Sequence, residues 1–156
     1  MFRLSKMSDY AVVVLSELGR EGLRPDGGAD QRSATGLAAA TGIAEPTVAK
    51  VLKLLGSAGL VTSRRGAQGG YRIARPLSQT AIADVIVAVE GPIALAACVD
   101  GATGGCEAEA CCPVRGRWDP VNSAIRRALA EITLADMQCP AWAPQPRERV
   151  AAVAIS

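Results

Sequence analysis

The fold of this chain is decided by the stretch TGIAEPTVAKVLKLL, residues 41–55. Gly42 ends a short helix predicted from about Thr35 to Thr41, because glycine accepts the left-handed backbone that closes helices. A second helix begins at Glu45-Pro46, since proline fits the first helical turn. Its predicted apolar face consists of Val48, Val51, Leu52 and Leu55. Two helices that meet across a tight turn predict a helix-turn-helix.

The start of the second helix offers polar side chains on the face away from the apolar stripe. In helix-turn-helix proteins this part of the second helix enters the major groove of DNA. The predicted DNA contacts of the helix are Glu45, Pro46, Thr47 and Lys50.

The stretch LVTSRRGAQGGYRI, residues 60–73, follows directly and contains two β-prone runs around a glycine-rich basic turn. This pattern predicts a β-hairpin, and its position after a helix-turn-helix predicts a DNA-binding wing. Arginines pair with phosphates or enter a narrow minor groove, and glycines let the turn approach the DNA backbone. The alternative is an ordinary solvated hairpin with a charged turn. The predicted wing contacts are Arg64, Arg65, Gln68 and Gly69.

Three further helices are predicted by apolar periodicity. The first runs from about Ser8, which we expect to cap it, to Arg20, and another runs from about Thr80 to Val89. The last begins at Asp119-Pro120. It is predicted to be the interface of a homodimer, or alternatively to pack on its own chain. Its apolar stripe consists of Val121, Ile125, Leu129 and Ile132.

These elements predict a mainly α fold: a winged helix-turn-helix with a small β-hairpin wing, a cysteine loop and a long dimerisation helix. The expected DNA-binding head comprises residues 1–76. Residues 77–137 hold a linker helix, the cysteine loop and the dimerisation helix, and residues 138–156 have the composition of a disordered tail. The head has 11 basic and 6 acidic residues, a net +5, whereas residues 77–137 have 4 and 8, a net −4. The basic half is therefore the expected partner of DNA.

Composition narrows the possible functions and locations. The chain has no histidine, which excludes a histidine general base and a histidine metal ligand. No pair of carboxylates stands at a suggestive spacing, so we do not expect an enzyme. No apolar run approaches the about 20 residues of a membrane span, and the first residues lack the apolar segment of a signal peptide. We therefore expect a cytoplasmic protein that does not enter a membrane.

Four of the five cysteines lie in one glycine-rich stretch, at positions 98, 106, 111 and 112. In the cytoplasm such cysteines are more often metal ligands or redox sensors than structural disulfides. Thiolates select zinc, copper(I) or iron–sulfur clusters, and a structural zinc site shows two close pairs, which this spacing lacks. The spacing favours a cluster and leaves zinc and a thiol switch open. We expect only one of the adjacent Cys111 and Cys112 to be a ligand.

Taken together, several strings resemble the family of small winged-helix iron–sulfur regulators typified by IscR and NsrR. They are RLSK and DYA from Arg3 and Asp9, TGI from Thr41, the wing RGAQGGY from Arg65, and the three-cysteine loop before Trp118. The match is closest to the branch that regulates SUF-system iron–sulfur assembly. The strings EPTVAKVLK, EGPIAL, CPVRG and TLADM, which begin at Glu45, Glu90, Cys112 and Thr133, resemble that branch.

The resemblance implies a repressor that binds palindromic DNA as a homodimer and senses iron–sulfur status. It implies a 2Fe–2S or 4Fe–4S cluster held by Cys98, Cys106 and Cys112, with Cys111 a bystander. Arg115 stands where IscR has a histidine ligand, so the fourth ligand is different here. Asp9 of the partner subunit is one candidate by resemblance to NsrR, and Cys111 or an exogenous thiol are others. Cys139 is expected to be inert.

Overall fold

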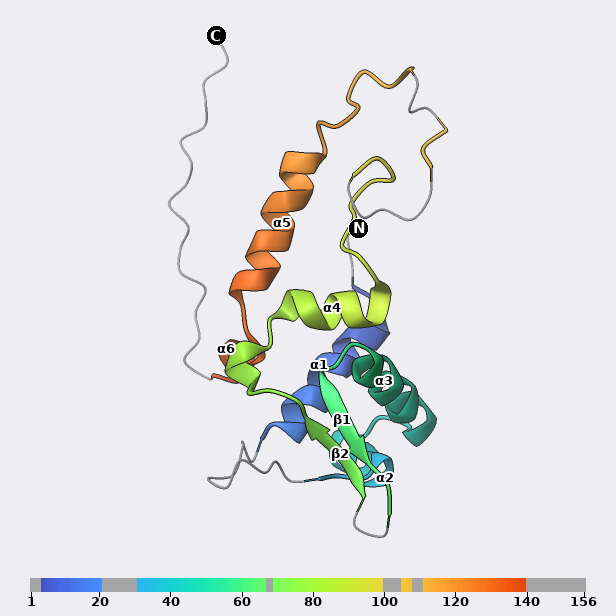
Figure 1. Cartoon of the computed structure of the whole chain (residues 1–156), viewed down its shortest axis with the longest axis vertical. Helices are drawn as coiled ribbons and strands as arrows, with labels where there is room; N and C mark the ends of the chain where they lie inside the picture. The colour runs from blue at the N-terminus through green and yellow to red at the C-terminus, as the bar shows by residue number, and fades with distance from the viewer. Residues whose placement is uncertain (1–3, 21–30, 67–68, 100–104, 108–110, 140–156) are drawn as a thin grey trace.

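The computed structural model describes residues 4–20, 31–66, 69–99, 105–107 and 111–139. Within them the chain is mainly helical with one two-stranded antiparallel sheet, which confirms the predicted fold class (Figure 1). The start of α5 and residues 111–118 that precede it lie at one end of the molecule, and the hairpin and α2 lie at the other. The elements are α1 Lys6–Leu18, α2 Ala34–Thr41, α3 Glu45–Ser57, β1 Val61–Arg64, β2 Gly70–Ile73, the 3-10 helix η1 Leu77–Gln79, α4 Ile82–Glu90, α5 Asp119–Glu131 and α6 Leu134–Gln138.

Helix α1 begins earlier than the sequence predicted. Ser5 is the N-cap, and its side chain accepts a hydrogen bond from the backbone N–H of Ser8. The expectation that Ser8 caps the helix is therefore wrong, because Ser8 already lies inside the first turn and is buried. Both serines can cap a helix, but only Ser5 has the extended backbone of an N-cap, with φ −68° and ψ 156°.

The helix-turn-helix is confirmed at α2 and α3. Gly42 closes α2 at φ 72°, and its N–H donates to the carbonyl of Ala38 at 2.9 Å. A side chain at this left-handed position is strained, which explains the glycine. Pro46 lies in the first turn of α3. The helix buries four apolar residues: Val48, Val51, Leu52 and Leu55.

The wing hairpin pairs β1 with β2 in a regular antiparallel register. Val61 faces Ile73 across the strands, and both side chains are buried. Thr62 faces Arg72 on the outer side of the hairpin, where both are exposed. An isolated bridge between Arg32 and Tyr71 adds a third segment beside β2. The hairpin is thus anchored on one face and open on the other.

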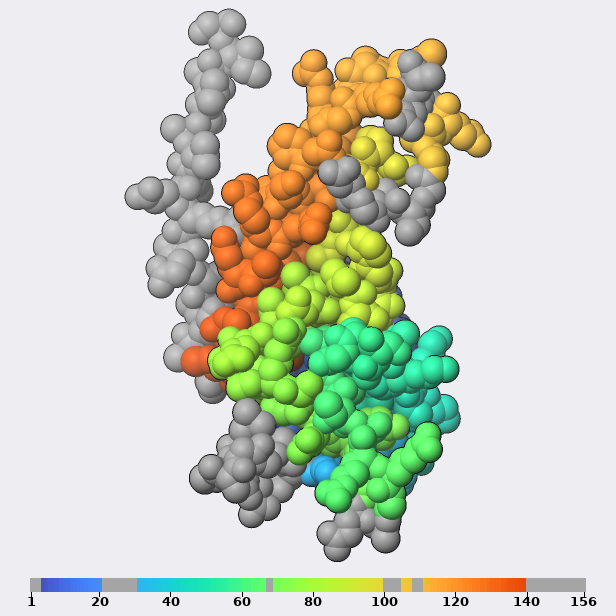
Figure 2. Space-filling view, viewed as in Figure 1, coloured from blue at the N-terminus to red at the C-terminus, as the bar shows by residue number. Residues whose placement is uncertain are grey.

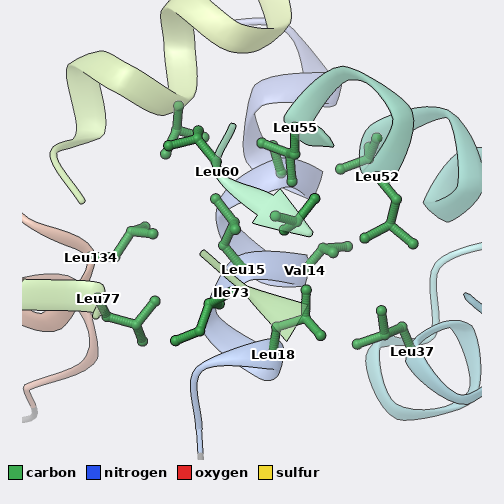
Figure 3. Close-up of a cluster of buried hydrophobic side chains, with 14 of the residues drawn as sticks. Val14, Leu15, Leu18, Leu37, Leu52, Leu55, Leu60, Ile73, Leu77 and Leu134 are labelled. Atoms are coloured by element: carbon green, nitrogen blue, oxygen red, sulfur yellow. The ribbon is translucent and has the colours of Figure 1, made fainter. Parts of the chain in front are cut away.

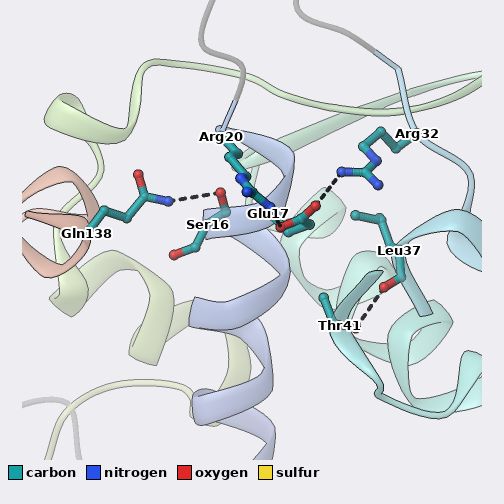
Figure 4. Close-up of polar contacts among 7 residues, drawn as sticks. All are labelled: Ser16, Glu17, Arg20, Arg32, Leu37, Thr41 and Gln138. Carbon is teal, nitrogen blue, oxygen red and sulfur yellow. Dashed lines mark hydrogen bonds and ion pairs between the residues drawn. The ribbon is translucent and has the colours of Figure 1, made fainter. Parts of the chain in front are cut away.

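The C-terminal elements return to the head. An isolated bridge joins Ala81 to Thr133, and the side chain of Leu134 is completely buried. The side-chain amide of Gln138 donates to the carbonyl of Ser16 in α1 at 2.9 Å (Figure 4). One apolar cluster contains Leu15 and Leu52 of the head together with Leu77 and Leu134 (Figure 3). The 1–76 and 77–137 segments therefore share a single core.

In the described part of the chain, no helix combines the length and apolar character that crossing a bilayer requires. The predicted tail falls at residues 138–156. Gln138 is the last residue of α6 and Cys139 follows as its C-cap, while residues 140–156 lie outside the described residues.

Candidate nucleic-acid interface and cysteine loop

The first turns of α3 carry the predicted major-groove contacts. Glu45, Pro46 and Lys50 are exposed and Thr47 is half-buried, because the opposite face of α3 is held in the core. The hydroxyl of Thr35 donates to the carboxylate of Glu45 at 2.9 Å, which fixes this side chain at the junction of α2 and α3. The start of α3 therefore offers two groups to the predicted major groove: the carboxylate of Glu45, oriented by Thr35, and the long charged side chain of Lys50.

The wing presents Arg64 and Arg65 at the end of β1, both exposed. Gly69 lies on the return side of the turn, and its N–H donates to the carbonyl of Gly66 at 2.8 Å. A Cβ at Gly69 would stand 2.3 Å from the carbonyl oxygen of Arg64, so only glycine fits. Gln68, the remaining predicted wing contact, lies outside the described residues. The protein surface at this end of the hairpin is visible in Figure 2.

Not every basic residue of the head is available to a partner. Arg32 Nη1 lies 2.5 Å from the carboxylate of Glu17, and Arg20 forms a second, longer ion pair with the same carboxylate at 3.6 Å (Figure 4). Arg75 pairs with Asp84 at 2.6 Å. In the part of the chain that the structure describes, Lys50, Arg64 and Arg65 make no such ion pair. Their charges therefore remain for an anionic ligand.

The cysteine loop begins directly after α4 and is tied to α5 by one buried amide. The side-chain oxygen of Asn122 accepts from the N–H of Leu95, and its nitrogen donates to the carbonyl of Ile93, both at 3.1 Å. Asn122 is only 3% exposed. Val99, next to Cys98, is also buried. The first part of the loop is thus fixed against the helix.

All five cysteines are free thiols, and burial separates them into two groups. The three predicted ligands, Cys98, Cys106 and Cys112, are half-buried, whereas Cys111 and Cys139 are exposed. Across the described residues, no three or more cysteine or acidic side chains gather into a group that could hold a metal ion. The thiols match a soft metal or a cluster in donor chemistry, but the loop would have to close around it.

Asp9, the predicted partner-subunit ligand, is exposed in the first turn of α1. The same turn contacts the last residue of α4, just before the cysteine loop. The backbone N–H of Ser5 donates to Glu90 Oε1 at 3.0 Å, and the hydroxyl of Ser8 donates to the same oxygen. These hydrogen bonds, led by the one from Ser8, hold the pKa of the Glu90 carboxyl below its ordinary value. The sequence carried no signal for this contact.

The predicted dimerisation stripe of α5 is divided by the structure. Val121 is 45% exposed and Ile125 is half-buried. Leu129 and Ile132 pack instead against the core of their own chain. Trp118, at the start of α5, is 44% exposed. The exposed apolar side chains therefore lie at the end of α5 next to the cysteine loop.

Comparison with known proteins agrees with this geometry. Residues 4–140 match the model of the Rrf2 family, described as iron-dependent transcriptional regulator. The chain is 32% identical over 131 residues to the protein aau3 of Rhizobium meliloti, which covers 81% of this chain and 74% of that protein. It is also 32% identical over 142 residues to Rv1287 of Mycobacterium tuberculosis, whose name describes an HTH-type transcriptional regulator. This match covers 86% of this chain and 80% of Rv1287.

Two solved structures share the fold over most of the chain. T. potens IscR has a TM-score of 0.61 at 28% identity and covers 87% of this chain and 85% of its own. CymR, the global cysteine regulator of B. subtilis, has a TM-score of 0.64 at 26% identity, with coverage of 88% and 96%.

Proposed function

Because this chain belongs to the Rrf2 family of transcriptional regulators, we propose that it represses iron–sulfur assembly genes and senses iron–sulfur status through its cysteine loop. Membership of the family makes it a helix-turn-helix transcription regulator rather than an enzyme. The proposed partner is a palindromic operator in the cytoplasm, bound by a homodimer. The proposed cofactor is a 2Fe–2S or 4Fe–4S cluster.

The observation that carries the DNA-binding part is the pairing of two exposed elements. The start of α3 offers Glu45 and Lys50, and the wing offers Arg64 and Arg65. Major-groove readers place such helix-start residues against base edges, and wing arginines contact phosphates or the minor groove. This division assigns sequence reading to α3 and backbone attachment to the wing. Pro46, Thr47, Gln68 and Gly69 complete the proposed contact set.

The sensing part rests on the three half-buried thiols. The proposed ligands are Cys98, Cys106 and Cys112, and the candidates for the fourth are Asp9 of the partner subunit, Cys111 and an exogenous thiol. A bound cluster would supply an iron centre that is lost under oxidation or iron limitation. Closure of the loop around it would order residues 98–112 against α5 and bias the spacing of the two heads. Ordering one segment in this way shifts a two-state equilibrium.

A second candidate is a thiol switch, or a zinc site, on the same scaffold. The thiol switch is favoured by the exposed free thiol of Cys111 in the cysteine loop and by the similarity to a protein named as a global cysteine regulator. Exposed thiolates oxidise to disulfides more readily than buried thiols. In this alternative the wing and α3 keep their roles and only the signal differs.

The deciding experiment is anaerobic purification followed by a visible spectrum with iron and sulfide assays. Visible absorption with an iron-to-sulfide ratio near one supports the cluster. A colourless protein that contains zinc, or that forms a disulfide on oxidation, supports the alternative. Cys98→Ala should abolish the colour, and Cys139→Ala is the matched control that should keep it.

DNA binding is tested separately with a promoter duplex from an iron–sulfur assembly operon. Affinity should fall steeply with salt, since each phosphate contact releases condensed counterions. Arg64→Gln and Arg65→Gln should each flatten that dependence. Cys98→Ala should alter the anaerobic affinity, and an unchanged affinity would overturn the sensing proposal while leaving DNA binding intact.

A further inference from the structure

A hollow of about 320 Å³ lies on the outer face of the wing hairpin. It is lined by Gln31, Thr62, Ser63, Arg64 and Arg72. Thr62 and Arg72 are directly paired across the strands, and paired side chains share a face of the sheet. Arg64 lies on that same face because it is two residues after Thr62. Two guanidinium groups therefore converge on one open hollow.

Arg72 is held in place but its charge is not neutralised. Its Nε donates to the hydroxyl oxygen of Thr62 at 3.1 Å, which fixes the plane of the guanidinium. Its terminal nitrogens have no protein partner among residues 4–20, 31–66, 69–99, 105–107 and 111–139. A guanidinium oriented at one nitrogen and free at the other two suits an anion with two oxygens.

Gln31 completes the lining of the hollow beside the hairpin. Its side-chain oxygen is buried and has no hydrogen-bond partner within the described part of the chain. Buried polar groups are rarely left unpaired. A half-turn of the amide would place its NH₂ group at that buried position instead of the oxygen, so Gln31 contributes to the wall of the hollow and Arg72 carries its charge. The hollow thus offers amide, hydroxyl and guanidinium groups together.

We propose that this hollow binds one phosphate of the operator DNA backbone, with Arg72 as the main charged contact and Gln31 and Thr62 beside it. The inference rests on the proposed DNA binding and deepens it. The hollow shares Arg64 with the proposed wing contact and lies next to the hairpin turn. A duplex backbone that runs along the wing would meet this face as well as the turn, and α3 would read the bases.

The test compares Arg72→Gln with a matched control, Arg75→Gln. Both variants remove one positive charge from the same stretch of chain, but Arg75 is already paired with Asp84. Arg72→Gln should weaken operator and random duplex alike, roughly three- to tenfold, and should reduce the slope of log affinity against log salt by about 0.9. Arg72→Lys should restore most of the slope, and Arg75→Gln should leave it unchanged.

Three results would overturn the proposal. In the first, Arg72→Gln has the same slope of log affinity against log salt as the unaltered protein, whereas Arg64→Gln has a flatter slope. This result leaves the proposed function standing. Another is an equal loss in both Arg72→Gln and Arg75→Gln. The third result would indicate an adventitious small-anion site. Inorganic phosphate at fixed ionic strength would raise the unfolding temperature of the DNA-free protein but not that of Arg72→Gln. The unaltered protein and Arg72→Gln would nevertheless have equal salt slopes in DNA binding. Absence of salt-dependent DNA binding by the unaltered protein would instead defeat the proposed function itself.

Discussion

The hydroxyl of Ser8 donates a hydrogen bond to Oε1 of Glu90, a residue 82 positions further along the chain. Ser8 is 1% exposed, and Glu90 is the last residue of α4. The bond joins the first turn of α1 to the point where the cysteine loop begins. The bond therefore ties the DNA-binding head directly to the helix that leads into the cysteine loop.

Ser8→Ala should lower the free energy of unfolding by about 1–2 kcal/mol, since it removes a donor to a charged acceptor. Urea denaturation at neutral pH measures this change. Ser57→Ala is the control, because its exposed hydroxyl only donates to the carbonyl of Lys53 within α3 and its loss should be small. Equal effects of the two substitutions would contradict a special role for the Ser8–Glu90 bond.

The contribution of the Ser8–Glu90 bond should depend on pH. The pKa of Glu90 is lowered, first by the hydrogen bond from Ser8, so folding favours the ionised carboxyl. The stabilisation is therefore complete above the ordinary glutamate pKa of about 4.3 and is lost as the pH falls through the lowered value. The stability gap between the unaltered protein and Ser8→Ala should narrow in acid. A gap that widens below pH 4 would refute this assignment.

The sequence predicted those parts of the fold that local chemistry determines. Gly42 and Pro46 mark the ends of neighbouring helices, and the glycine-rich basic turn marks the hairpin; each signal acts within a few residues. It missed the burial of Ser8, because the partner of that serine is distant in sequence. A sequence also does not indicate which partner buries an apolar stripe. It therefore places Val121 and Leu129 in one dimerisation stripe, although only Val121 is strongly exposed and Leu129 packs against the core.

Two glycines of the helix-turn-helix should respond to alanine in opposite directions. Gly42 has φ 72°, so Gly42→Ala should destabilise the fold by about 1–2 kcal/mol. Gly56 lies inside α3, and an added Cβ would meet only Val61 Cγ2 at an ordinary 3.9 Å. Gly56→Ala should therefore stabilise the protein by about 0.5–1 kcal/mol. Thermal unfolding of both variants measures the difference, and a shared sign would be inconsistent with these backbone conformations.

Asn122 should hold the first part of the cysteine loop in place. Asn122→Ala removes hydrogen bonds to both Leu95 and Ile93 and leaves those half-buried backbone groups without their protein partner, which costs about 1–3 kcal/mol. Limited proteolysis should then cut the loop between residues 91 and 99 faster than in the unaltered protein. The neighbouring Ser123 is exposed, so Ser123→Ala serves as the control. Unchanged cleavage in Asn122→Ala would show that the loop is held by other contacts.

Helix α5 offers a pair of substitutions that separates dimerisation from folding. Val121 is 45% exposed beside Trp118, whereas Leu129 packs on its own core. A charge in a buried apolar interface is costly. Val121→Asp should therefore shift the proposed dimer towards monomer in sedimentation velocity while the unfolding temperature of the subunit changes little.

Leu129→Ala should have the reverse effect, because truncating a core-packed leucine removes contacts within the subunit and costs about 1–3 kcal/mol. Its self-association should persist under conditions where the subunit stays folded. If Val121→Asp remained dimeric, the exposed end of α5 would not be the interface. The proposed route from the cysteine loop to the spacing of the two heads would then have to run through the contact between α1 and Glu90 alone.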